Sequence, residues 1–319
     1  MPRVLLTRRL PLAGLAPLRE AGFAVEVLAD REPASRQELL TGVAGVDALI
    51  TLVSDRVDAE LLDAAGPSLK IVANYAVGVN NIDFEACKAR GVAVSNTPDV
   101  LTAATADLTF ALLLAVARRL LAGDALVRSG AWRGWQPDQL LGLSVEGASL
   151  GIVGMGRIGG AVARRARGFG MSVVYHNRSA APELEAETGA RRSDLGALLS
   201  DSDFVSLHCP LTPATHHLID RRALALMKPT AVLINSARGP LVDERALAEA
   251  LAAGQIWGAG LDVFEREPEV ERRLLALENV VLAPHIGSAT ETARTAMARL
   301  CAEAVVAVLA GVEPANLVG

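Results

Sequence analysis

The chain has 319 residues, of which 51% are hydrophobic and 21% are charged, and its formal net charge is −5. This composition is typical of a globular protein and excludes an intrinsically disordered chain. The acidic balance and the lack of a Lys/Arg-rich block argue against a nucleic-acid partner.

Short β-branched runs alternate along the chain with longer segments rich in Ala, Leu and Arg. Strands that alternate with helices predict an α/β fold with parallel sheets covered on both faces. Strands are expected at residues 4–7, 24–28, 48–52, 70–74, 93–96, 149–153, 172–176, 204–209, 231–236, 258–263 and 280–283.

Two segments depart from this alternation. Residues 101–123 contain the run LTFALLLAV, which is apolar nearly all round and must therefore be buried on several sides. The run is too short to cross a membrane, and we interpret it as one long helix at a domain or subunit interface. The second segment, residues 291–310, is expected to form a final helix.

The length predicts two domains, at about 150 residues per domain. We place the crossings between them near Pro98 and near His285. Residues 99–285 would then form a middle domain inserted into a domain built from residues 1–98 and 286–319.

The cysteines and the first residues bear on the compartment. Cys87, Cys209 and Cys301 are odd in number and far apart, without CxxC or another metal-ligand spacing. This pattern favours a reducing, cytoplasmic location and predicts no metal site. The first residues lack the apolar core and cleavage site of a signal peptide.

A glycine pattern follows one of the expected strands and precedes a segment typical of a helix. Gly154, Gly156 and Gly159 form GxGxxG. In a dinucleotide-binding turn these glycines allow a tight turn, the approach of a pyrophosphate, and close packing of helix on strand. The pyrophosphate would rest on the helix N-terminal amides, at Arg157 and Ile158. The alternative is a strand–turn–helix without a ligand, because GxGxxG alone is a weak signal.

The choice of cofactor depends on the stretch HNRS, residues 176–179, which closes the next strand. An acidic residue usually stands here, where it binds a free ribose hydroxyl and would repel a ribose phosphate. This chain has Asn177 instead, followed by Arg178 and Ser179, which can donate hydrogen bonds to a phosphate or pair with it. The stretch predicts NADP(H) as the preferred cofactor, with NAD(H) as the alternative.

Polar residues follow apolar strands in three stretches of the last third of the chain: NSARG, GLDVFEREP and PHIGS. Ligands of open α/β sheets bind at the carboxyl ends of the strands. Arg238 offers a planar fork for a carboxylate, and His285 can deliver and recover a proton near neutral pH. Taken singly, Arg238 could instead be a surface ion pair and His285 a buried structural histidine.

The chain carries four patterns in this order: GxGxxG, NSARG, GLDVFExEP and PHIGS. Together they resemble the motifs of the D-isomer-specific 2-hydroxyacid dehydrogenase family, and the resemblance extends over essentially the whole chain. The stretches NYAVGVN, NTPDVLT and WRGW are similar to its glyoxylate/hydroxypyruvate reductase branch. The resemblance implies two doubly wound parallel-sheet domains, a Rossmann-type coenzyme domain inserted into a flavodoxin-like substrate domain. It also implies NADPH-dependent reduction of glyoxylate and hydroxypyruvate to glycolate and D-glycerate.

The resemblance assigns catalytic roles to three residues. Arg238 would hold the carboxylate of a small 2-oxo acid and polarise its ketone, while His285 would donate the proton. Glu267, directly before the proline of its motif, would orient the imidazole and favour its protonated form. Glu265 is then expected to face solvent.

Further substrate residues are carried over by position. Val77 and Gly78 would offer backbone amides to the substrate carboxylate, because a glycine lets the chain approach closely. Leu52 would line the small pocket, and Ser288 would lie near the catalytic histidine. Trp135 resembles a tryptophan that reaches a neighbouring subunit's pocket; plain interface packing is the alternative.

Cofactor residues follow from the same resemblance. Asp262 would bind the nicotinamide carboxamide, Ser236 and Ala237 would offer backbone atoms to it, and Pro210 would cover the adenosine.

A homodimer through residues 101–123 is expected, without a nucleic-acid or membrane partner. Another dehydrogenase of the D-lactate or D-3-phosphoglycerate type remains an alternative, as does a corepressor-like protein that binds a dinucleotide without turnover.

Overall fold

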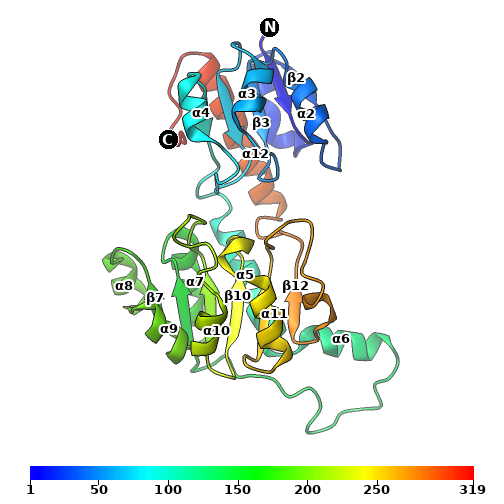
Figure 1. Ribbon diagram of the computed structural model, residues 1–319, viewed down its shortest axis with the longest axis vertical. Helices are drawn as coiled ribbons and strands as arrows, with labels where there is room; N and C mark the ends of the chain where they lie inside the picture. Colours follow the sequence, from blue (N-terminus) through cyan, green and yellow to red (C-terminus); the bar gives the residue numbers. More distant parts are fainter. The chain divides into compact units, whose positions relative to one another are not determined.

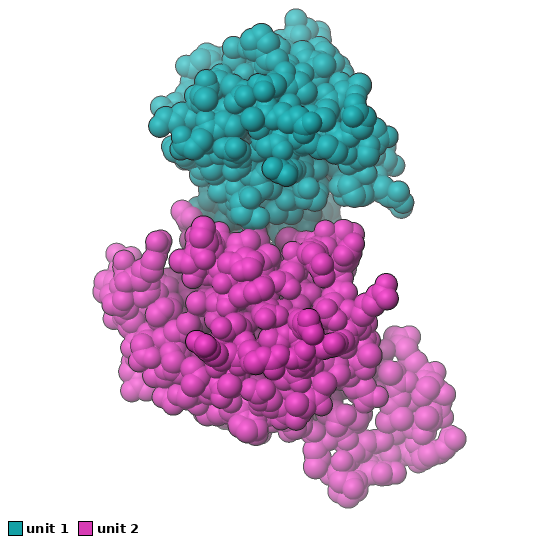
Figure 2. Space-filling model, in the orientation of Figure 1, with its two compact units in different colours: residues 1–101, 288–319 teal, residues 102–287 magenta.

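The computed structural model describes the whole chain, Met1–Gly319, which divides into two compact units (Figures 1 and 2). Unit 1 comprises Met1–Leu101 and Ser288–Gly319, and unit 2 comprises Thr102–Gly287. Each unit has a parallel sheet of its own. The chain thus leaves unit 1 once and returns to it for the last helix.

Unit 1 is built on a five-stranded sheet in the order β2-β1-β3-β4-β5, which is the flavodoxin-like order. Its strands are β1 (Arg3–Leu6), β2 (Ala24–Val27), β3 (Ala48–Thr51), β4 (Ile71–Asn74) and β5 (Ala93–Ser95). Its helices are η1 (Leu12–Leu15), α1 (Ala16–Glu20), α2 (Arg36–Gly42), α3 (Ala59–Ala65), α4 (Phe84–Ala89) and α12 (Glu291–Leu309).

The elements of unit 1 follow from local sequence. Every residue of β3 and β4 is buried, which explains why these strands are apolar up to their last residues, Thr51 and Asn74, rather than alternating. Helices α3 and α4 begin where a side chain caps them: Asp58 and Asp83 each accept a hydrogen bond from the amide three residues on. The expected final helix is confirmed as α12, capped by Thr290 and packed against η1, α1 and β4.

Unit 2 is built on a seven-stranded sheet in the order β12-β11-β10-β9-β6-β7-β8. Its strands are β6 (Ser149–Val153), β7 (Ser172–His176), β8 (Arg191–Arg192), β9 (Phe204–Leu207), β10 (Val232–Asn235), β11 (Gly258–Leu261) and β12 (Val280–Leu282). Its helices are α5 (Thr102–Ala117), α6 (Leu120–Arg128), α7 (Arg157–Gly168), α8 (Pro182–Thr188), α9 (Leu195–Asp201), α10 (Arg221–Leu226), η2 (Gly239–Leu241), α11 (Glu244–Ala252) and η3 (Leu274–Ala276). The order of the strands reverses at β6, beside β9, and this switch point is where open α/β sheets bind ligands.

The α/β class and every expected strand are confirmed. Sequence analysis missed β8, which pairs with β7 through Arg191 and Arg192. Both arginines are exposed, so this edge strand carries no apolar pattern that could have revealed it.

The single long helix expected at residues 101–123 is wrong. α5 ends at Ala117 and α6 begins at Leu120, because Arg119 adopts a left-handed backbone with φ of 51°. α5 packs against α7, β10 and β11 within unit 2, which accounts for its apolar surface on several sides. α6 contains no buried residue, and it projects from the sheet of unit 2 together with the following loop (Figure 1). None of the helices combines the length and apolarity that crossing a membrane requires.

Candidate active site

The three glycines of the loop after β6 meet three different steric requirements. Gly154 has a φ of 102°, and a Cβ there would lie 2.4 Å from the backbone nitrogen of Cys209, which follows β9. A Cβ on Gly159 would lie 2.2 Å from the carbonyl oxygen of Gly154. Gly156, by contrast, faces open space, with nothing within 4 Å of a Cβ. Because Gly156 also caps α7, the loop leaves room for a pyrophosphate at the N-terminus of that helix.

The first residues of α7 complete this loop. Arg157 is exposed and Ile158 is half-buried, and both stand in the first turn, where backbone amides lack helical partners. Pro210 is exposed, and its carbonyl accepts a hydrogen bond from Thr215 Oγ1 at 2.8 Å. The residues present therefore fit a dinucleotide, because the loop offers both the donors and the space that a pyrophosphate needs.

The stretch HNRS lies against the glycine loop. The backbone N–H of Met155 donates to Asn177 Oδ1 at 2.7 Å, so the amide side chain fixes the loop. Arg178 and Ser179 are exposed beyond it. Arg192 of β8 donates to the carbonyl oxygens of Asn177 and Arg178, at 2.9 and 2.7 Å. Arg192 is therefore a second cation beside this stretch.

Arg238 follows β10 in a turn that other side chains hold rigid. Asn235 is buried; its Nδ2 donates to the Arg238 carbonyl at 2.9 Å, and its Oδ1 accepts the N–H of Ala237 at 3.1 Å. Ser236 shares a hydrogen bond of 2.8 Å with Thr109 of α5. Burial lowers the pKa of the Arg238 guanidinium and the charge of Glu267 opposes this effect, so Arg238 remains a cation at neutral pH.

His285 and Glu267 form a hydrogen-bonded pair. His285 Nδ1 lies 2.8 Å from Glu267 Oε2, and Glu267 Oε1 accepts the N–H of Phe264 at 3.0 Å. Burial would raise the pKa of Glu267, but the hydrogen bond and charge of His285, with the charge of Arg238, hold it below its usual value. Because the carboxylate engages Nδ1, Nε2 is the ring nitrogen left to exchange a proton.

Asp262 fixes the backbone around His285. Its carboxylate oxygens each accept a hydrogen bond of 2.7 Å, from the N–H groups of Ile286 and Gly287. Its carbonyl oxygen accepts the N–H of His285 at 2.9 Å. These bonds hold His285 at a left-handed φ of 54°, which is costly for a residue with a side chain. Burial raises the pKa of Asp262, against the effect of these donors.

In unit 1, the loop after β4 turns its carbonyl groups toward asparagine side chains. Asn74 Nδ2 donates to the carbonyl of Gly78 at 2.9 Å, and Asn96 Nδ2 donates to that of Val77 at 2.8 Å. The amides of Val77 and Gly78 have no partner within the protein. Two adjacent free amides of this kind can bind a carboxylate.

Two further expected substrate residues have well-defined backbone partners in unit 1. The Leu52 N–H donates to Asp55 Oδ2 at 2.8 Å, and the Leu52 carbonyl accepts from Asn81 Nδ2 at 3.1 Å. The carbonyl of Ser288 accepts the Nε–H of Arg294 at 3.3 Å. Both residues are half-buried, so their side chains are partly accessible.

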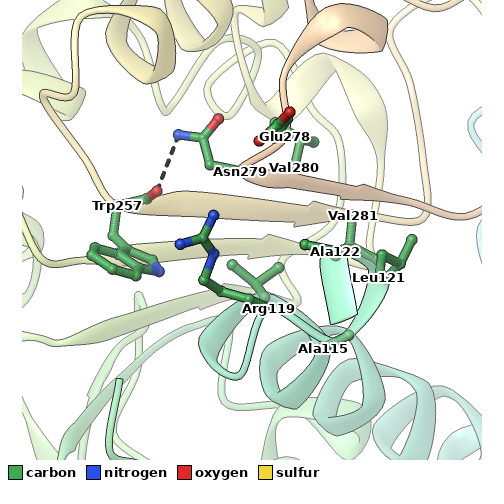
Figure 3. Close-up of a pocket in the computed structure, with 10 residues that line it drawn as sticks. Ala115, Arg119, Leu121, Ala122, Trp257, Glu278, Asn279, Val280 and Val281 are labelled. Carbon is green, nitrogen blue, oxygen red and sulfur yellow. Dashed lines mark hydrogen bonds between the residues drawn. The ribbon is translucent and has the colours of Figure 1, made fainter. Parts of the chain in front are cut away.

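Trp135 stands on the segment that projects from unit 2, which we call the arm (residues 120–141). Its side chain is 81% exposed. Other large apolar side chains exposed along the arm are Leu120, Leu121, Val127, Trp132 and Leu141. At the base of the arm, a cavity of about 300 Å³ is lined by Val116, Arg119, Leu121, Trp257 and Val281, among others. Figure 3 shows Arg119 extending from the junction of α5 and α6 toward Trp257 and Asn279.

The structure revealed supporting residues that sequence analysis missed. Arg192 was overlooked because the short strand that carries it was not recognised. Asn235 was noticed only as part of a motif, although an amide inside an otherwise apolar strand needs hydrogen-bond partners and so signals a structural role. Glu265, expected to face solvent, is only 24% exposed and pairs with His217. No group of three or more His, Cys, Asp or Glu side chains is placed to hold a metal ion.

The chain is similar in sequence and in structure to known proteins. Residues 110–287 match the family described as D-isomer specific 2-hydroxyacid dehydrogenase, NAD binding domain. A glyoxylate reductase of Thermococcus litoralis is 54% identical, over 99% of this chain and 96% of the relative. A solved structure from Thermus thermophilus is 52% identical with a TM-score of 0.94, over 99% of this chain and 100% of that one. An NADPH-dependent glyoxylate/hydroxypyruvate reductase from Sinorhizobium meliloti, solved with NADP and malonate, is 35% identical with a TM-score of 0.87, over 100% of this chain and 97% of that one.

Proposed function

The chain belongs to the D-isomer specific 2-hydroxyacid dehydrogenase family and is an NAD(P)-dependent dehydrogenase, and on this premise we propose that it reduces glyoxylate and hydroxypyruvate. The products would be glycolate and D-glycerate. The observation that carries the proposal is the pairing of His285 with Glu267 beside the charge of Arg238, where three parallel strands of unit 2 end.

Each residue of this set has a distinct task. The guanidinium of Arg238 holds the carboxylate of the 2-oxo acid and polarises its ketone oxygen. A nicotinamide cofactor, when bound, would supply the hydride for the ketone carbon. His285 Nε2 donates a proton to the oxygen, which would otherwise become an alkoxide. Glu267 stabilises the protonated ring through Nδ1, so that the proton is available when negative charge develops on the oxygen.

The remaining substrate and cofactor roles are proposed by position. The free amides of Val77 and Gly78 would bind the substrate carboxylate, with Leu52 and Ser288 beside the substrate. Asp262 would face the nicotinamide carboxamide, with the backbone of Ser236 and Ala237. The same carboxylate has a structural task as well, because it holds the segment that carries His285.

NADPH is the proposed preferred cofactor, with NADH accepted less well. The support is the set of cations around HNRS, where Arg178 is exposed and Arg192 donates to the loop's carbonyls. Asn177 stands where an acidic residue would repel the ribose phosphate. The Sinorhizobium meliloti neighbour was solved with NADP, which is consistent with this assignment for a related fold.

A homodimer is also proposed, through the arm rather than through the whole of residues 101–123, because α5 is packed within unit 2. The arm exposes large apolar side chains along its length, and such patches mark interfaces. Trp135, the most exposed of its tryptophans, would pack against the second copy.

The free cysteines Cys87, Cys209 and Cys301 fit a cytoplasmic location.

The test is a panel of 2-oxo acids assayed with both nicotinamide cofactors. We expect glyoxylate and hydroxypyruvate to give the highest kcat/KM, with NADPH ahead of NADH. Pyruvate or 3-phosphohydroxypyruvate as the best substrate would place the enzyme in a different branch. Absence of turnover, with dinucleotide binding intact, would show a binding protein instead.

A further inference from the structure

The first residue of α11 is a buried carboxylate that the proposed reaction does not use. Glu244 is only 5% exposed, although acidic side chains are rarely buried without a cation. Its Oε1 accepts the backbone N–H of Glu265 at 2.5 Å, and its Oε2 accepts that of Glu271 at 3.3 Å. Burial raises the pKa of Glu244, the two amides lower it, and the charges of Glu265 and Glu271 raise it further.

The two amides bound by Glu244 flank the catalytic acid. Glu265 precedes Glu267 in the chain and Glu271 follows it. One carboxylate therefore ties both ends of the segment of residues 265–271 to α11. The backbone at Phe264, just before this segment, packs tightly on the turn that carries Arg238. There is no room for a side chain between them, because a Cβ on Gly239 would lie 1.9 Å from the backbone of Phe264. The N–H of Phe264 in turn binds Glu267 Oε1.

We propose that Glu244 is a positioning residue, whose carboxylate holds both flanks of this segment so that Glu267 meets His285 Nδ1. The inference rests on the proposed function for the catalytic roles of Glu267 and His285. It does not depend on which 2-oxo acid is reduced, because Glu244 acts only through the acid that it positions.

A carboxylate is suited to this task because it has two equivalent acceptor oxygens, one for each amide. Glutamine at this position would keep one acceptor and turn an NH₂ group toward the other N–H, where two donors face each other. One flank of the segment would then be released, and Glu267 would drift from His285. Arg238 and Asp262, whose charges also act on the pair, would stay in place.

The variants are Glu244→Gln and, should that protein be unstable, Glu244→Asp, which keeps both oxygens on a shorter side chain. The matched control is Glu249→Gln on the solvent-facing side of the same helix, where the carboxylate pairs with Arg221 and Arg273. Dinucleotide affinity and Tm are measured for each protein, to show that the fold and the glycine loop are intact.

In Glu244→Gln we expect kcat for glyoxylate to fall by about 10- to 100-fold, as displacement of a catalytic group by about 1 Å can cause. KM and dinucleotide affinity should stay near those of the wild type, and Glu249→Gln should behave as the wild type. The alkaline limb of the kcat–pH profile should move to lower pH, because a displaced Glu267 stabilises the imidazolium less well. Unchanged kcat, or a loss of kcat without a shifted limb, would overturn the proposal.

A second measurement separates this inference from the proposed function. A crystal structure of Glu244→Gln gives the distance between His285 Nδ1 and Glu267 Oε2, which is 2.8 Å in the wild type. We expect this distance to lengthen beyond hydrogen-bonding range, whether or not glyoxylate is turned over. An unchanged distance would refute the positioning role, whereas a lengthened one in a protein without reductase activity would refute only the proposed function.

Discussion

Replacement of Glu267 by glutamine removes one charge from the proposed catalytic pair of Glu267 and His285 and leaves the shape of the pair nearly unchanged. The atoms of the pair are 2.8 Å apart, and the side chains of His285 and Glu267 are 34% and 35% exposed. Because both are this accessible, the dielectric of water is the appropriate one, and it gives an attraction of about 1.5 kcal/mol. At about 1.4 kcal/mol per factor of ten, the loss corresponds to a fall in kcat of about tenfold.

The assay is the pH dependence of kcat for glyoxylate reduction at saturating NADPH. We expect kcat of Glu267→Gln to be about tenfold lower near neutral pH, and the alkaline limb of its profile to lie at lower pH than in the wild type, because the imidazolium loses its counter-charge. KM for glyoxylate should change little, since Arg238 and its turn are untouched. An alkaline limb at the same pH in both proteins would refute the reasoning, because Glu267 would then not stabilise the protonated ring.

Further predictions concern stability, the glycine loop, the cofactor and the arm. The fold lowers the pKa of Glu267, so the contribution of its carboxylate to stability is complete at neutral pH and is lost as the pH falls through the acid range. The difference in Tm between wild type and Glu267→Gln should therefore shrink toward low pH. Gly156→Ala should keep the wild-type Tm but lose dinucleotide affinity, measured by fluorescence titration. Gly159→Ala should instead lose about 1–3 kcal/mol of unfolding free energy, because its Cβ would clash with the backbone. The reverse pattern would contradict the loop geometry. Asn177→Asp combined with Arg178→Ile should move the NADPH/NADH ratio of kcat/KM toward NADH by at least about tenfold, since about 1.4 kcal/mol of repulsion suffices; an unchanged ratio would exclude HNRS as the selector. Leu121→Asp combined with Trp135→Ser should shift the protein toward monomer in sedimentation, and an unchanged oligomeric state would remove the arm from the interface.

The parallel sheets were predictable because buried strands are nearly continuous apolar runs. The seven-stranded unit shows this, since β9 and β10 are buried at every residue. The break between α5 and α6 was not predictable, because neither glycine nor proline marks it and Arg119 adopts the left-handed backbone instead. β8 was not predictable either, because its two exposed arginines give no apolar pattern that distinguishes a strand from a loop.

The residues of the proposed catalytic set could be selected from motifs, but the side chains that support them could not. Spacing singled out His285 and Glu267, and the structure shows them in contact. The tasks of Glu244 and Asp262 depend on backbone amides far away in sequence, and no local pattern reveals such partners. Asn177 illustrates the same limit, because its sequence position suggested a cofactor ligand and the structure adds a hydrogen bond to Met155.

The central claim is that His285 delivers the proton in the reduction of a 2-oxo acid. The most direct test compares wild type and His285→Ala for kcat with glyoxylate and NADPH, alongside the affinity of each protein for NADPH. The account predicts clear turnover by the wild type, a collapse of kcat in the variant, and nearly equal affinities. A variant that keeps the wild-type kcat would contradict the account.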